Sequence, residues 1–189
     1  MAKRDRFAPF LFEPEHPAVC PEAVSHFDAL VRPSFRVFEF GSGNSTLWFA
    51  KRVRSIISVE SREAWHHLLV QRAVELGLEN LTILLRPVER DSLESATRYA
   101  RSILEYPEEH FQLIFVDGLV RIQCVENAFS RVSDGGYVVV DEAGRKGLPL
   151  RSLTHILKGW PFEIIRGQKR FSLQGKLRGT NTTFFRRVL

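Results

Sequence analysis

The sequence predicts an α/β fold in which a doubly wound, mostly parallel sheet carries helices on both faces. Short apolar runs typical of strands alternate along the chain with segments whose apolar residues recur at helical spacing, and this alternation is typical of parallel sheets. Three of the apolar runs end in an acid, at Glu60, Asp117 and Asp141. Ligand-binding residues of such sheets lie just after the strands, so these ends also predict where the site lies.

Length and composition fit one domain. The chain has 189 residues, 44% of them hydrophobic and 26% charged, so we expect a single domain over residues 1–189 with its own core. No apolar run reaches the roughly 20 residues of a membrane span. The charged N-terminus lacks the pattern of a signal peptide, and two cysteines are too few for a disulfide framework. We therefore expect a cytoplasmic protein with no membrane contact.

The first 32 residues are predicted to form an arm and one helix in front of a core over residues 33–189. Residues 1–19 contain three prolines and are expected to be irregular. A helix is predicted over Pro21–Leu30, because Pro21 suits a first helical turn and Pro33 stops the pattern.

The first half of the core is predicted from apolar runs and glycines. Val37–Phe40 is expected to be a short buried strand, and Leu47 begins an apolar helix after a glycine loop. Ser55–Glu60 and Leu81–Leu85 are β-rich runs and predict two further strands. Between them, Glu63–Leu76 has apolar side chains on one face and is followed by a glycine, which predicts a helix.

The second half of the core continues the alternation. We expect strands over Gln112–Asp117 and Tyr137–Asp141, the second introduced by a turn at Gly135-Gly136. Two closing strands are expected on either side of a segment, residues 167–179, that is rich in glycine, lysine and arginine; they cover Phe162–Ile165 and Thr182–Arg187. The predicted helices of this half cover Ser92–Leu104, Arg121–Val132 and Leu150–Lys158.

Residues 36–50 are the stretch around which the prediction is organised. Gly41 and Gly43 let the backbone turn tightly and approach a ligand, and the helix that follows begins with good N-cap residues. A strand, a glycine loop and a helix N-terminus form a nucleotide-type site. Glu60, 19 positions after Gly41, can accept hydrogen bonds from both hydroxyls of a ribose. A nicotinamide dehydrogenase is disfavoured, because Thr46 occupies the third glycine position of G-x-G-x-x-G.

From Val37 to Asp141 the chain resembles the class I S-adenosylmethionine-dependent methyltransferases. The segment Glu39–Thr46 is similar to the first motif of that family, and Val59-Glu60 is similar to its ribose-binding acid. Phe115–Gly118 resembles the motif after the fourth strand, and Asp134–Asp141 resembles the glycine turn and fifth strand. The resemblance implies a seven-stranded sheet of order 3-2-1-4-5-7-6 and S-adenosylmethionine as cofactor.

The resemblance also implies a role for each matched residue. The backbone of Gly41–Gly43 would lie against the methionine part of the cofactor, Glu39 would anchor its amino group directly or by holding the loop, and Glu60 would bind the ribose. Glu89 lies near the position of the family's adenine contact. The cofactor-binding residues implied in this way are Glu39, Gly41, Ser42, Gly43, Asn44, Ser45, Thr46, Glu60, Glu89, Asp117 and Gly118.

Acids after the fourth and fifth strands are the candidates for chemistry. We expect Asp117, Asp141 and Glu142 to be catalytic, with Asp141 or Glu142 as general base for a hydroxyl or amine. Methyltransferases of the catechol type hold Mg²⁺ with acids at these positions. Three oxygen donors would suit a divalent ion, but the usual Asp-Asn pair is Asp141-Glu142 here, so a metal is not the favoured reading. Basic residues beside these loops are predicted to bind an anionic substrate group: Arg121, Arg145 and Lys146.

Charge is unevenly distributed along the chain. Residues 143–189 hold 11 Lys/Arg and one acid, a net of +10, whereas residues 1–142 hold 16 Lys/Arg and 21 acids, a net of −5. This asymmetry fits either an anionic partner or a solvated basic surface. We expect O-methylation of a small or carbohydrate-like acceptor. Methylation of RNA through the basic segment Gln168–Arg178, and a non-catalytic module that binds nucleic acid or protein, remain as alternatives.

Overall fold

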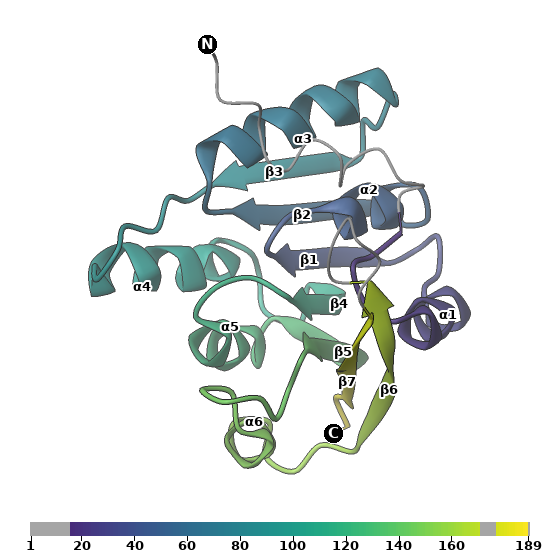
Figure 1. Ribbon diagram of the computed structural model, residues 1–189, viewed down its shortest axis with the longest axis vertical. Helices are drawn as coiled ribbons and strands as arrows, with labels where there is room; N and C mark the ends of the chain where they lie inside the picture. The colour runs from purple at the N-terminus through teal and green to yellow at the C-terminus, as the bar shows by residue number, and fades with distance from the viewer. Residues whose placement is uncertain (1–15, 171–176, 189) are drawn as a thin grey trace.

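The computed structural model describes residues 16–170 and 177–188, and the predicted arm over residues 1–19 lies mostly outside them. Seven strands form one sheet in the order β3-β2-β1-β4-β5-β7-β6, which confirms the predicted order (Figure 1). β7 runs antiparallel to both of its neighbours, β5 and β6, and the other neighbouring pairs are parallel. The strands are β1 (Arg36–Phe40), β2 (Ser55–Glu60), β3 (Leu81–Leu85), β4 (Phe111–Val116), β5 (Val132–Asp141), β6 (Phe162–Arg170) and β7 (Leu177–Arg186).

Helices cover both faces of the sheet, as predicted. On one face, α1, α2 and α3 pack against side chains such as Val37, Ile56 and Phe115. On the other face, α4, α5 and α6 pack against Phe38, Ile114 and Val140 with a short 3₁₀ helix, η2 (Figure 1). The helices are α1 (Pro21–Leu30), α2 (Asn44–Ala50), α3 (Glu63–Glu75), α4 (Leu93–Arg101), η2 (Ser102–Glu105), α5 (Arg121–Ala128) and α6 (Leu150–Ile156).

Several predicted boundaries are confirmed to the residue. The helix α1 and the strands β2 and β3 have the predicted bounds. The helix α2 begins earlier than predicted, at Asn44, with Gly43 as its N-cap. The reason is a local hydrogen bond: the N–H of Gly43 donates to Oγ1 of Thr46 at 2.9 Å, which satisfies a donor at the helix start.

The predictions for α5 and β5 are wrong at their junction. The helix ends at Ala128, four residues before the predicted Val132, and Val132 already belongs to β5, where it pairs with Phe111. The glycine pair lies within β5 at a register shift and does not precede it. A Cβ at Gly136 would lie 2.8 Å from the carbonyl oxygen of Ser133, so only glycine fits this bulge.

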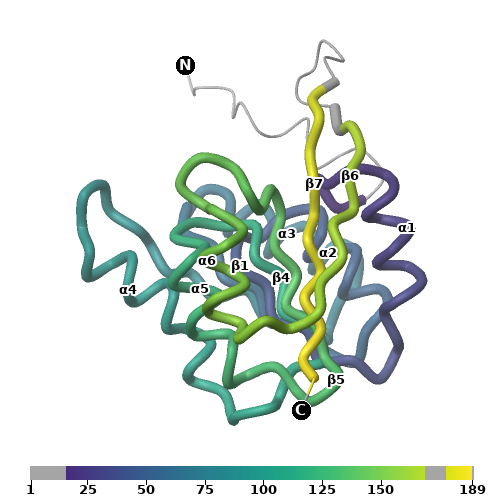
Figure 2. The backbone as a smooth tube through the Cα atoms, turned by 90° about the horizontal axis from the view of Figure 1, so that it is seen from below, coloured from purple at the N-terminus to yellow at the C-terminus, as the bar shows by residue number. Residues whose placement is uncertain are grey.

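The last two strands are longer than predicted and form a projecting hairpin. The strand β5 ends at Asp141, which pairs with Thr182. Beyond that pair, β6 and β7 continue together for the five pairs from Arg166↔Asn181 to Arg170↔Leu177. Figure 2 shows the two strands extending beyond the body of the described chain. The basic segment predicted to link two short strands therefore belongs largely to the hairpin, apart from residues 171–176, which lie outside the described residues.

No helix in the described part of the chain is long and apolar enough to cross a membrane. The cytoplasmic location expected from the sequence stays a prediction.

The side chain of Phe27 makes the first helix, α1, part of the hydrophobic core. Its ring is fully buried and lies 5.3 Å from Phe49, 5.3 Å from Phe115 and 4.9 Å from Phe184, measured between ring centroids. Phe27→Ala should lower the free energy of unfolding in urea by about 3–5 kcal/mol, because it leaves a cavity among aromatic rings. In the control Val74→Ala, on the exposed side of α3, the change should stay within about 0.5 kcal/mol. A loss of the same size in both variants would contradict a core role for α1.

Candidate active site

The predicted site residues meet at the carboxyl edge of the sheet. The loops after β1, β2 and β4 are joined by backbone hydrogen bonds: the N–H of Gly41 donates to the carbonyl of Val59 at 2.9 Å, and that of Asp117 donates to the carbonyl of Phe40 at 2.9 Å. The parallel register of β1 with β2 and β4 brings these strand ends together. The glycine loop therefore lies between Glu60 and Asp117.

Two glycines from different loops touch at this edge. Gly41 has a φ of +93°, and a Cβ there would lie 2.6 Å from Cα of Gly118. A Cβ at Gly118 would in turn lie 2.0 Å from the hydroxyl oxygen of Tyr99 in α4. Both positions therefore require glycine, for conformation at Gly41 and for space at both.

A buried carboxylate holds the glycine loop and the start of α2. Glu39 in β1 is fully buried and accepts hydrogen bonds from the hydroxyls of Ser45 at 2.5 Å, of Ser58 at 2.6 Å, and of Thr46. Ser42 in the loop is linked to the same cluster by a hydroxyl pair with Ser58 at 2.7 Å. These contacts hold the loop in place, and a role of Glu39 in anchoring the cofactor's amino group stays a prediction.

The pKa of Glu39 is raised from 4.5 to about 7. Burial is the main cause because it penalises the charged form, whereas the hydrogen bonds from Ser45, Ser58 and Thr46 act in the opposite direction. Repulsion from Glu60 adds to the increase. The carboxyl group therefore changes charge near neutral pH.

Glu60 ends β2 with a buried side chain. Its Oε1 accepts hydrogen bonds from the backbone N–H groups of Ser61 at 2.9 Å and Arg62 at 2.8 Å, and the Arg62 guanidinium lies 3.6 Å away. These donors fix the orientation of the carboxylate next to the glycine loop. This is the position at which the sequence predicts a ribose contact.

Arg121 joins the ends of β4 and β5. Its guanidinium donates to a carboxylate oxygen of Asp117 at 2.7 Å and to the carbonyl of the same residue at 2.9 Å. It also donates to the carbonyl of Gly118 at 3.0 Å and to the carbonyl of Asp141. The side chain is only 9% exposed, so Arg121 is a buried clamp. A direct substrate contact by Arg121 stays a prediction.

The acids after β5 have different surroundings. Asp141 is fully buried, and its Oδ1 accepts a hydrogen bond from the hydroxyl of Thr182 at 2.9 Å. Glu142 is partly exposed and pairs with Arg145 at 2.8 Å, while Lys146 beside it is exposed. Among residues 16–170 and 177–188, no group of three or more His, Cys, Asp or Glu side chains is placed to hold a metal ion. The alternative ligand set of Asp117, Asp141 and Glu142 is therefore not formed.

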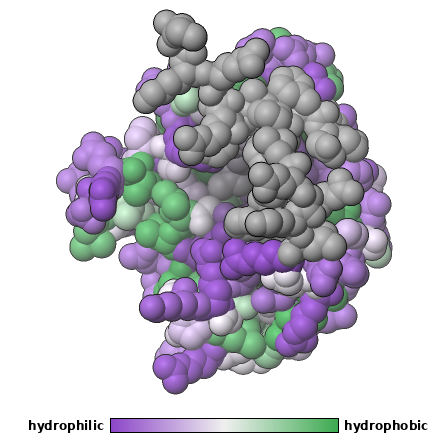
Figure 3. All heavy atoms as spheres, viewed as in Figure 1, coloured by the Kyte–Doolittle hydropathy of each residue, from purple (hydrophilic) through white to green (hydrophobic). Residues whose placement is uncertain are grey.

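The predicted adenine contact has no comparable support. Glu89 is exposed in the loop between β3 and α4, and its backbone N–H donates to the hydroxyl of Ser95 at 3.0 Å. Apolar side chains reach the surface beside the projection that α4 forms at the left of the view in Figure 3. Leu93 in α4 and Leu119 after β4 are 72% and 46% exposed, so apolar contacts are available in this half of the molecule.

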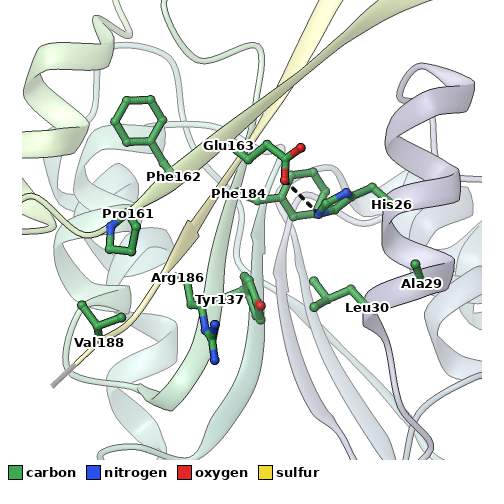
Figure 4. Close-up of a pocket in the computed structure, with 10 residues that line it drawn as sticks. All are labelled: His26, Ala29, Leu30, Tyr137, Pro161, Phe162, Glu163, Phe184, Arg186 and Val188. Atoms are coloured by element: carbon green, nitrogen blue, oxygen red, sulfur yellow. Dashed lines mark ion pairs between the residues drawn. The ribbon is translucent and has the colours of Figure 1, made fainter.

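A separate cavity of about 490 Å³ lies far from these loops. It opens between α1 and the amino-terminal parts of β5 and β6, and Phe184 and Tyr137 line its wall (Figure 4). At its edge, Nε2 of His26 lies 3.8 Å from Oε2 of Glu163. The pairs Tyr137↔Arg186 and Phe162↔Phe185 place it toward the amino edge of the sheet. It includes none of the predicted site residues.

Two residues of the site were missed in the sequence. Ser58 holds Glu39, and its signal is a polar residue between the apolar Ile57 and Val59 of a buried strand. Tyr99 is 1% exposed and lies on the buried face of α4 with Ala96 and Ala100, so helical spacing could have placed it in the core but not against Gly118. Ser58 acts through hydrogen bonds and Tyr99 through packing, each with residues distant in sequence.

Residues 38–143, more than half of the chain, match the family model described as a methyltransferase domain. The chain belongs to this family, and its fold is that of the class I S-adenosylmethionine-dependent methyltransferases. No match is found among proteins of curated function.

Solved structures share the fold at low sequence identity. An S-adenosylmethionine-dependent O-methyltransferase from Thermotoga maritima is 18% identical (TM-score 0.61; 89% of this chain and 66% of that one). A tRNA (m1A58) methyltransferase from Aquifex aeolicus is 16% identical (TM-score 0.60; 92% and 71%). A Streptococcus mutans protein in complex with SAH is 12% identical (TM-score 0.59; 88% and 97%). Their different acceptors leave the acceptor of this chain open.

The carboxyl group of Glu39 gives a pH-dependent prediction. Because its pKa is near 7 when folded and about 4.5 when unfolded, the folded state binds the extra proton between these values. The stabilisation that this proton provides is fully present below pH 4.5 and is lost as the pH rises through 7. Glu39→Gln lacks this titration, so its free energy of unfolding relative to the natural chain should rise between pH 5 and 8, by at most about 3 kcal/mol.

The measurement is urea unfolding of both proteins at pH 5, 6, 7 and 8. Glu75→Gln on the exposed side of α3 is the matched control, and its difference from the natural chain should be nearly constant. A difference for Glu39→Gln that does not change with pH would show that Glu39 does not titrate in this range.

Proposed function

We propose that the loops after β1, β2 and β4 bind S-adenosylmethionine. The observation that carries this proposal is the position of Glu60, a buried carboxylate fixed by two backbone N–H groups next to the close contact of Gly41 with Gly118. A carboxylate there suits the two hydroxyls of a ribose. The carboxylates of Glu60 and Asp117 also lie at this edge, paired with Arg62 and Arg121, and a carboxylate there suits a cationic sulfonium.

The chain's residues would mainly hold the reactants and accept a proton. When bound, S-adenosylmethionine supplies an electrophilic methyl group. Its displacement by a nucleophile needs alignment more than acid–base chemistry. Asp117, held by Arg121, would lie beside the donor and the acceptor. We assign the general base to Glu142 before Asp141, because Glu142 is partly exposed while Asp141 is fully buried.

The acceptor we propose is a small or carbohydrate-like molecule with an anionic group, methylated on oxygen. Arg145 and Lys146 are exposed next to Glu142, so an anionic group there would find cations close to the proposed base. The non-catalytic alternative is disfavoured because the chain belongs to a methyltransferase family.

Cofactor binding is tested by calorimetry with S-adenosylhomocysteine. The natural chain should bind it, and Glu60→Ala should weaken the affinity by about 10- to 100-fold, because a charged acceptor of hydrogen bonds is lost. Glu75→Ala, which removes an exposed acid from α3, should bind as the natural chain does. No binding by the natural chain, or equal affinities for all three proteins, would contradict the assignment.

RNA is the second candidate acceptor, and the observation that favours it is the projecting β6–β7 hairpin. The segment Gln168–Arg178 contains four basic residues and no acid. If RNA is bound there, affinity for a single-stranded oligonucleotide should fall steeply with salt. It should also fall when the four basic residues are neutralised together: Lys169, Arg170, Lys176 and Arg178. Binding that survives this change would remove the support that the hairpin gives to RNA.

A further inference from the structure

Arg166 in the β6–β7 hairpin lies on the same face of the sheet as the loop that follows β5. Side chains alternate along β6, so Arg166 shares a face with Phe162, whose partner Phe185 packs into the core under α5 and α6. The loop from Glu142 to Pro149 leads from β5 to α6 on that face. Arg178 pairs with Lys169 and so belongs to the opposite face of the hairpin.

The backbone brings Arg166 close to Glu142. Arg166 is opposite Asn181, and the carbonyl of Asn181 accepts a hydrogen bond from the N–H of Glu142 at 2.7 Å. Two neighbouring strand spacings put Arg166 and Glu142 roughly 10 Å apart between their Cα atoms. Arg145 reaches the carboxylate of Glu142 from the other side, at 2.8 Å. The long side chains of Arg145 and Arg166 can therefore converge on one bound group.

The charges around this point are mostly positive. Arg166 and Lys146 are exposed, and Arg145 has 46% of its side chain exposed. Glu163, the single acid of residues 143–189, lies near the amino end of β6 beside His26, away from this edge. Glu142 offsets one positive charge, which leaves an excess of cations next to the proposed general base.

We propose that Arg145, Lys146 and Arg166 form an anion-binding rim that takes a phosphate-type group of the acceptor beside the methyl donor. This inference rests on the proposed function and names Arg166 as a specificity-determining residue. Guanidinium groups bind phosphate with paired, charge-assisted hydrogen bonds, and their planar fork loses less freedom for each hydrogen bond formed than a lysine side chain does. The five-pair extension of β6 and β7 positions Arg166 at this edge.

The test uses inorganic phosphate as the probe, in a chemical-shift titration at low ionic strength. The natural chain should bind phosphate saturably, and Arg166→Ser should raise the dissociation constant about tenfold or more. Arg166→Lys should recover part of the affinity. The matched control is Arg54→Ser, which removes one exposed positive charge just before β2, at the amino edge. The dissociation constant of Arg54→Ser for phosphate should stay within about twofold of that of the natural chain.

The titration separates this inference from the proposed function. Arg166→Ser should bind S-adenosylhomocysteine with unchanged affinity, because Arg166 is not part of the cofactor edge. If S-adenosylhomocysteine fails to bind the natural chain but phosphate still binds through Arg166, the proposed function fails and the rim stands. The rim proposal would be overturned if Arg54→Ser and Arg166→Ser raised the dissociation constant for phosphate equally. It would also be overturned if the natural chain did not bind phosphate at all.

A second titration distinguishes a small acceptor from a polymer. Glucose 6-phosphate should behave as inorganic phosphate does and depend on Arg166, whereas Arg178→Ser should have little effect on it. The rim proposal is wrong if an oligouridylate binds while the small phosphates do not, and if Arg166→Ser and Arg178→Ser weaken the oligouridylate equally. The hairpin would then be a general surface for polyanions.

Discussion

Three hydroxyl groups from α2 and β2 donate to one buried carboxylate in β1, and the cofactor edge depends on this arrangement. An unsatisfied buried carboxylate would cost several kcal/mol, so Ser45, Thr46 and Ser58 must stay in place for Glu39 to remain inside. The same bonds fix the first turn of α2. The glycine loop between β1 and α2 thus has both of its ends attached to one group, which restricts its conformation before any ligand binds.

A second charged group performs the equivalent task on the other half of the site. Arg121 binds the carboxylate and carbonyl of Asp117 and the carbonyls of Gly118 and Asp141, which ties β4 to β5. The two halves meet where Gly41 touches Gly118. The carboxyl group of Glu39 therefore organises the loop after β1, and the guanidinium of Arg121 organises the ends of β4 and β5. Neither group needs to touch a ligand to be essential for the geometry.

Local signals predicted most of the fold, and contacts between distant segments explain what was missed. The bounds of α1 follow from the prolines beside it, and those of β2 and β3 follow from short apolar runs. These signals are local, so the bounds do not depend on contacts with distant segments. Val132 looked helical because it continues the apolar spacing of α5, but its pairing with Phe111 places it in a strand. The extension of β6 and β7 beyond the pair Ile165↔Thr182 is mostly polar and contains glycine, so no apolar pattern indicated that the two predicted strands continue there.

The candidate site shows the same division. The residue types at the strand ends predicted which residues gather at one edge, because parallel strands bring their carboxyl ends together there. Their roles in binding stay predictions. The role of Arg121 could not be predicted, since it depends on two strand ends meeting: three acceptors belong to Asp117 and Gly118 after β4, and the fourth is the carbonyl of Asp141, 20 positions away at the end of β5. The sequence alone offered only a basic residue near two acids, which fits a substrate contact equally well.

The separation of charge along this edge also bears on the chemistry. Acids lie at the ends of β1, β2 and β4, where Glu60 and Asp117 are paired with arginines, and exposed cations dominate the region after β5 and on β6. Transfer of a methyl group from a sulfonium to an oxygen anion removes one positive and one negative charge, so less charge has to be stabilised as the reaction proceeds. An acidic donor half would hold the cation, and a basic acceptor half would favour the ionised form of the nucleophile. The proton acceptor then has a smaller task, which fits a partly exposed Glu142 already paired with Arg145.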